Sequence, residues 1–223
     1  MGIFKADSPL MQKLALLFDL MALNILTVVL SIPIVTIGAA TTALYDALWR
    51  IKKQEASPLR DYWRAFRSNF KQATLLFIPV FLLGLSISYA LLLSVLNPLI
   101  IPDFVGISLV ICAIVWIMVV AWIFPLQSRF VNTWGRMIMN SLICALRFLP
   151  HTIAMSALNL IPWIILIFAP ASFLKWGILW LLLWFALAAY WNICLLDAPF
   201  RLLTESALPA DADQVSGENI PEE

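Results

Sequence analysis

Few side chains in the sequence could do chemistry, and their spacing matches no familiar catalytic motif. His151 is the only histidine, so the chain cannot form an HExxH zinc site. Serines occur in apolar sequence at positions 86, 88 and 156, but the GxSxG turn that exposes a nucleophilic serine is absent. We therefore expect a non-enzymatic protein with no metal and no cofactor; an intramembrane hydrolase that uses His151 is the weaker alternative.

The three cysteines do not indicate a redox or metal site either. Cys112, Cys144 and Cys194 are far apart in the chain and lack CxxC spacing. Each lies in apolar sequence, where a free cysteine behaves as a small apolar residue. We expect all three to serve in packing.

Asp19, Asn24 and two small hydroxyl residues, Thr27 and Ser31, interrupt the first apolar segment. A charged side chain costs about 2.5–3.5 kcal/mol at the centre of a bilayer, so Asp19 is a candidate for binding or proton transfer. It follows Lys13 by only six residues, roughly 9 Å along a helix, which favours a structural acid near the membrane interface. Asn24 lies deeper, and we expect it to form a hydrogen bond between helices.

The composition requires a lipid environment for most of the chain. Of 223 residues, 63% are hydrophobic and 12% are charged, whereas soluble domains are roughly half apolar and a quarter charged. A helix needs about 20 apolar residues to cross a bilayer. The sequence predicts an all-α bundle of about five spans in one domain, residues 1–204, followed by a disordered acidic tail, 205–223. The predicted spans are 14–32, 73–96, 104–126, 151–168 and 173–196.

An amphipathic helix is predicted over residues 58–71, before the second span. Aromatic and basic side chains recur there at helical spacing on two separate faces, which is typical of a helix that lies on a lipid surface. We expect this surface helix to contact membrane lipid and not nucleic acid. The residues that define it are Arg60, Trp63, Arg64, Phe66, Arg67, Asn69, Phe70 and Lys71.

The positive charges predict how the chain is oriented. Half of the lysines and arginines lie between Arg50 and Lys71, and a second basic segment carries Arg129, Arg136 and Arg147. Cytoplasmic loops of membrane proteins are enriched in these residues. Both segments should therefore face the cytoplasm, with the N-terminus outside and the C-terminus inside.

The first span is followed by a helix break and then by small residues. Pro33 removes a backbone donor and Gly38 lacks a side chain, so the helix should kink or break between them. Small residues from Gly38 onward recur at four-residue spacing and let a second helix approach closely. The residues of this packing motif are Pro33, Thr36, Gly38, Ala39, Thr42 and Ala43. Asp46 and Arg50, four residues apart, should pair on the helix surface.

Three blocks of sequence carry a resemblance to a known family. The first block is Leu23-Asn24 with residues 32–45, and the second is residues 61–72. The third is a central block of residues 124–130, with Pro125 and Arg129, followed by Asn140 and by Leu149-Pro150. In this order they resemble the YesL-like family of bacterial membrane proteins. The family has no assigned activity, and its members are often encoded beside carbohydrate-uptake ABC transporters.

Two functions are therefore to be distinguished. The resemblance implies an accessory subunit that associates with a carbohydrate ABC transporter, and the small-residue face offers a surface for such an association. The alternative is a small solute transporter or channel in its own right. Such proteins place polar groups near the middle of the bilayer, often on broken helices.

Overall fold

The computed structural model describes residues 9–53, 57–97, 102–130 and 132–205, and the regular structure in these ranges is helical, without strands. The predicted all-α class is confirmed. The elements are α1 (Pro9–Leu30), η1 (Ile34–Thr36), α2 (Ile37–Lys52), α3 (Pro58–Leu96), α4 (Asp103–Gln127), α5 (Trp134–Arg147), α6 (Leu149–Phe168), α7 (Pro170–Lys175), α8 (Gly177–Leu179), η2 (Trp180–Trp184) and α9 (Phe185–Glu205). The predicted acidic tail lies outside the described residues beyond Glu205.

Five helices are long and apolar enough to cross a membrane, as the sequence predicts: Leu10–Leu30, Pro58–Leu96, Asp103–Gln127, Leu149–Phe168 and Leu182–Thr204. The fifth lies later in the chain than the predicted span of 173–196. Pro170 and Gly177 begin two short helices, α7 and α8, and the continuous helix starts only after them. It extends to Glu205 because Leu196 and Phe200 are buried in the core.

The predicted break between Pro33 and Gly38 is present and takes the form of a turn followed by the 3-10 helix η1. Helix α1 ends at Leu30, and α2 begins at Ile37. The Thr36 hydroxyl donates a hydrogen bond to the carbonyl of Pro33 at 2.7 Å, which holds the turn closed. The chain can therefore reverse between α1 and α2 within a few residues.

The amphipathic segment is not a separate surface helix. Residues 58–71 and the following span form one helix, α3, of 39 residues. Lys71, Gln72 and Ala73 join the two parts, and none of them interrupts a helix. Pro79 lies inside α3 without ending it. At 1.5 Å per residue α3 is about 58 Å long, almost twice the roughly 30 Å hydrocarbon core of a bilayer.

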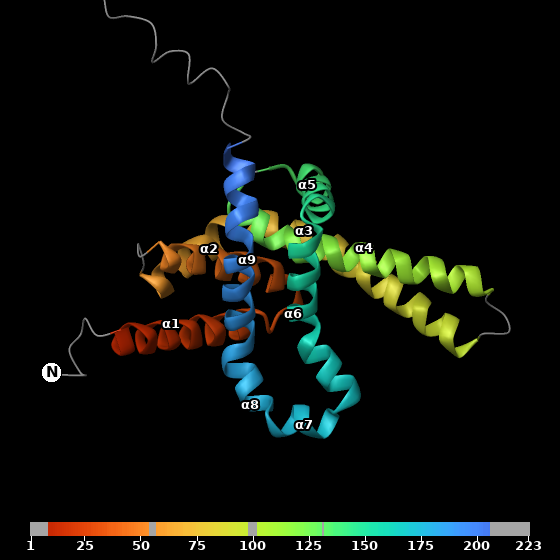
Figure 1. Ribbon diagram of the computed structural model, residues 1–223, viewed down its shortest axis with the longest axis horizontal. Helices are drawn as coiled ribbons and strands as arrows, with labels where there is room; N and C mark the ends of the chain where they lie inside the picture. Colours follow the sequence, from red (N-terminus) through yellow and green to blue (C-terminus); the bar gives the residue numbers. More distant parts are fainter. Residues whose placement is uncertain (1–8, 54–56, 98–101, 131, 206–223) are drawn as a thin grey trace, which may run out of the picture.

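The helices extend from a common centre in different directions (Figure 1). Helix α1 lies on one side, the hairpin of α3 and α4 extends to the opposite side, and α6 and α9 run across them. Helices α7 and α8 connect the far ends of α6 and α9, while α5 lies near the other end of α9. Helix α2 is at the centre, and ten of its residues are buried.

The hydrophobic core lies where these elements meet. Its largest fully buried side chains include Leu48 of α2, Tyr62 and Leu76 of α3, Trp122 of α4 and Ile193 of α9. The hairpin beyond this centre is different, because most of its large apolar side chains are exposed. Within it, the indole N–H of Trp116 donates to the carbonyl of Val80 at 2.8 Å and joins α4 to α3.

Candidate functional site

The small residues of α2 are the contact surface for α3. Gly38, Ala39, Thr42 and Ala43 are buried. A Cβ atom at Gly38 would lie 2.5 Å from Cβ of Phe77 and 2.7 Å from the carbonyl oxygen of Ala73. The predicted close approach of a second helix is therefore confirmed, and the partner is the middle of α3. The expectation that this face is a surface for association with another protein is wrong, because α3 of the same chain covers it. Of the other motif residues, Pro33 is exposed and Thr36 is half-buried.

Tyr62 joins the first turns of α3 to the same surface. The residue is fully buried, and its hydroxyl donates to the carbonyl of Ala40 at 3.1 Å. Phe66, one turn later, is also buried. The sequence predicted that this aromatic face rests on lipid. The structure instead turns its central residues into the protein, and leaves Leu59, Trp63 and Phe70 exposed at its edges.

The basic face of α3 points away from the protein. Arg60, Arg64, Arg67 and Lys71 are exposed. Arg64 pairs with the buried Asp61 at 2.6 Å, and Asp61 also accepts a hydrogen bond from the backbone N–H of Ser57 at 3.1 Å. The guanidinium of Arg67 lies 5.0 Å from the ring centre of Trp63. Asn69 donates to the carbonyl of Ala65 within its own helix at 3.0 Å.

The two polar residues of α1 have different surroundings. Asn24 is fully buried, and its side-chain oxygen accepts a hydrogen bond from the backbone N–H of Ala186 at 2.8 Å. It therefore ties α1 to α9, which confirms the predicted bond between helices. Asp19 is half-buried, and no hydrogen bond or ion pair is found for its carboxyl group among the described residues.

A second set of polar contacts joins α9 to α2 and α6. The amide of Asn192 in α9 donates to the Tyr45 hydroxyl of α2 at 3.0 Å and to the Asn159 side-chain oxygen of α6 at 3.1 Å. Burial raises the pKa of Tyr45 to about 12, so its hydroxyl stays protonated. The side-chain oxygen of the fully buried Asn192 has no partner in the described part of the chain.

The central block lies beside the end of α2 that carries Lys52 and Lys53, which we call the charged end of the protein. Pro125 is buried inside α4, and the guanidinium of Arg129 lies 4.8 Å from the ring centre of Trp49 at the end of α2. This contact joins the two basic segments, which therefore lie on the same side of the protein. The predicted pair of Asp46 and Arg50 is also present, with an N–O distance of 3.0 Å.

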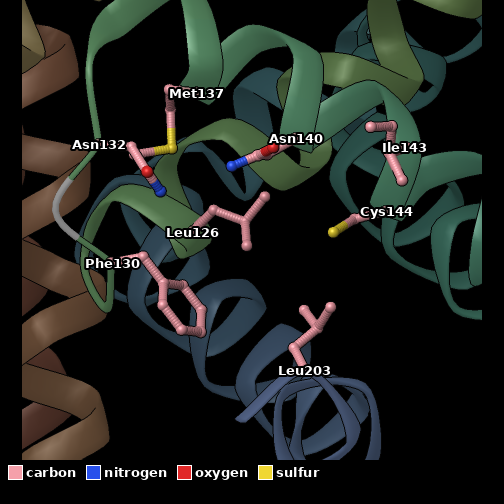
Figure 2. A pocket seen from close by; sticks show the side chains of 8 residues that line it. All are labelled: Leu126, Phe130, Asn132, Met137, Asn140, Ile143, Cys144 and Leu203. Atoms are coloured by element: carbon pink, nitrogen blue, oxygen red, sulfur yellow. The ribbon is translucent and has the colours of Figure 1, made fainter. Parts of the chain in front are cut away.

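Asn140 of the central block lines a pocket of about 230 Å³ between α4, α5 and α9. Figure 2 shows its side chain directed toward Asn132 and Met137, with Leu203 of α9 on the opposite side. Most other lining residues are apolar: Leu126, Phe130, Ile143 and Cys144. Burial raises the pKa of the Cys144 thiol to about 11, so it carries little thiolate at neutral pH.

The sequence reasoning missed α5 and the aromatic cluster that it helps to enclose. Buried Met137, Ser141 and Cys144 recur at helical spacing in α5, a pattern that predicts an amphipathic helix. Trp122 of α4 stacks on Phe148 at 5.8 Å between ring centres, and its indole N–H donates to the Thr152 hydroxyl at 2.8 Å. No sequence pattern pairs these residues, because they come from different helices.

Residues 20–91 match a family described as "Protein of unknown function, DUF624". This region includes the second half of α1, all of α2 and most of α3, the elements that meet around Gly38. No curated protein matches the chain, and no solved structure matches it. The match supports a family without an assigned function, and the resemblance to YesL-like proteins stays a prediction.

Proposed function

We propose that the protein is a non-enzymatic accessory subunit that docks laterally on another membrane protein through its α3–α4 hairpin. The observation that carries the proposal is the exposure of this hairpin. In the most apolar 18-residue stretch of α4, only 6% of the residues are buried within the protein. This surface must be covered by lipid tails or by helices of another protein, because contact with water is unfavourable for it.

Small residues on the exposed side of α4 favour a protein partner over lipid alone. Ser108 and Cys112 are both exposed and are four residues apart, so they share one face. The Ser108 hydroxyl donates to the carbonyl of Phe104 in its own helix at 2.7 Å, so it needs no further partner in an apolar environment. Small residues at this spacing let a second helix pack closely within a membrane.

The partner class follows from the resemblance of the sequence. YesL-like proteins are often encoded beside carbohydrate-uptake ABC transporters, so we propose a permease subunit of such a transporter as the partner. The positive-inside rule supports a place in the bacterial cytoplasmic membrane, with the basic segments and the C-terminus in the cytoplasm. Since Arg129 lies over Trp49, both basic segments can face the same compartment.

Several contacts support a non-enzymatic function. The hydroxyls of Ser86 and Ser88 donate to the carbonyls of Leu83 and Gly84 in their own helix, and the Ser156 hydroxyl forms no hydrogen bond with His151 among the described residues. His151 packs edge-on against Phe148, with 6.3 Å between ring centres. In the ranges that the structure describes, no three residues among His, Cys, Asp and Glu are grouped to hold a metal ion.

Cys112→Trp is expected to prevent docking, because a large ring would hold the partner helix away from the small-residue face. Purification of the tagged protein in mild detergent should recover the permease subunit with the wild type and about tenfold less with the variant, a difference of about 1.4 kcal/mol. Val110→Trp is the matched control, since Val110 is also exposed but lies on the opposite face of α4. Equal recovery with both variants, or no permease with the wild type, would contradict the proposal.

Transport by the protein itself is the second candidate, because polar side chains are buried at the helix contacts. Asn192 keeps one unpaired side-chain oxygen beside Tyr45 and Asn159. If the protein transports a small solute, vesicles that contain only this chain should show a sugar or ion flux that Asn192→Leu removes. Vesicles without flux for either protein would argue against this function and leave lateral docking unaffected.

A further inference from the structure

A second pocket, of about 440 Å³, lies at the charged end of the protein. Three parts of the chain that are distant in sequence meet there: the last turn of α2, the segment after α4 and the last turns of α9. The lining residues are Trp49, Lys52, Lys53, Arg129, Asp197, Phe200, Arg201 and Thr204. Four of these side chains are cations, and only Asp197 is an acid.

The positive charge of the pocket is larger than the negative charge of the helix ends and the acid beside it. Helices α2, α4 and α9 all end near this pocket, and each helix C-terminus carries about half a negative charge. Together with Asp197, which pairs with Lys52, these ends offset about two and a half of the four positive charges. Even without Arg201, which makes an interaction of its own, the other three cations exceed these negative charges by about half a unit, which is left for a bound anion.

Trp49 provides an independent indication of a ligand. Only 6% of the residue is exposed, and it lines the pocket. Its indole N–H has no hydrogen-bond acceptor among the described residues. The ring is held between Phe200, with 5.4 Å between ring centres, and the guanidinium of Arg129. A buried donor without an acceptor is costly, and an oxygen of a bound anion would satisfy it.

We infer that this pocket binds a phosphate group. Arginine and lysine bind phosphate oxygens through charge-assisted hydrogen bonds, and the Trp49 indole adds a neutral donor. The phosphate can belong to the head group of an anionic phospholipid or to a soluble phosphorylated solute. Basic pockets between membrane helices on the cytoplasmic side suit lipid head groups, and the apolar helices α4 and α9 end at this pocket. The inference does not depend on lateral docking.

Binding can be measured on the full chain purified in a neutral detergent. Native mass spectrometry with added phosphatidylglycerol should show one tightly bound lipid, which phosphatidylcholine should not replace. Glycerol 3-phosphate carries the same phosphate group without acyl chains. An increase in thermal stability on its addition measures whether a soluble phosphorylated solute binds in the pocket. Weak binding of this solute beside tight binding of phosphatidylglycerol would assign the site to lipid. Equal binding of the two would assign it to a soluble phosphate.

Arg129→Gln should weaken the preferred ligand about tenfold, as expected for the loss of a hydrogen bond to a charged group. Trp49→Phe, which keeps the aromatic contact and removes the indole N–H, should weaken binding by a smaller factor. Arg136→Gln is the matched control, because Arg136 is an exposed cation of α5 that does not line the pocket. Equal affinity for phosphatidylglycerol and phosphatidylcholine without glycerol 3-phosphate binding, or equal weakening by Arg129→Gln and Arg136→Gln, would overturn the inference.

Discussion

Gly38→Ala is expected to destabilise the protein by about 3 kcal/mol, the upper part of the range for overpacking a tight contact. The new methyl group would lie 2.5 Å from Cβ of Phe77 and 2.7 Å from the carbonyl oxygen of Ala73. Neither atom can move by rotation of a side chain, because one is backbone and the other is attached directly to it. Helices α2 and α3 must therefore separate, which also stretches the bond from Tyr62 to the carbonyl of Ala40.

The measurement is unfolding in detergent micelles, by heat or by titration with a denaturing detergent. Gly135→Ala is the matched control, because a Cβ atom at Gly135 in α5 would meet nothing within 4 Å. The control should leave stability unchanged or raise it by up to about 1 kcal/mol, since glycine weakens a helix. The same destabilisation in both variants would contradict the prediction, because Gly135→Ala creates no close contact and the loss would then not come from the contact of Gly38 with α3.

Trp122→Ala is expected to cost about 3–5 kcal/mol, as large truncations of buried aromatic residues do. Trp122 is fully buried and contacts Phe148 and Phe200, with 5.8 Å and 6.3 Å between ring centres. Its removal leaves a cavity where α4, α6 and α9 meet, and the Thr152 hydroxyl loses a donor. Trp122 thus contributes to the contact of three of the apolar helices at once.

Trp163→Ala provides the comparison, because Trp163 is 62% exposed on α6. A substitution at such a surface site changes stability by no more than about 0.5 kcal/mol. Unfolding of both variants in the same detergent should therefore separate them by several kcal/mol. A similar loss for Trp163→Ala would mean that the exposed surface of α6 has a stabilising partner, and the importance assigned to the Trp122 cluster would have to be reduced.

The sequence predicts the apolar helices well, because their length and composition are local properties. The helix break at Pro33 and the close approach at Gly38 also follow from the residues at those positions. The identity of the approaching helix does not, since small residues on α2 fit any helix that reaches them. The structure assigns this role to α3 through Ala73 and Phe77.

The amphipathic segment shows why the contacts between helices could not be predicted from the sequence. An apolar face on a helix has the same spacing whether it is covered by lipid or by protein. The burial of Tyr62 and Phe66 depends on α2, which contributes the acceptor of the Tyr62 hydroxyl. The pocket around Trp49 was missed for the same reason, since its cations come from segments up to 149 positions apart, Lys52 and Arg201.

The continuity of α3 has a mechanical consequence. Because α3 is a single helix of 39 residues, its C-terminal part in the apolar hairpin and its N-terminal part near Arg60 must move together. Helices tilt when the thickness of the surrounding bilayer changes. Over a length of about 58 Å, a tilt of about 10° would displace one end relative to the other by about 10 Å. Thinning or thickening of the lipid around the hairpin would thus be transmitted to the opposite end of the rod without any change in its internal hydrogen bonds.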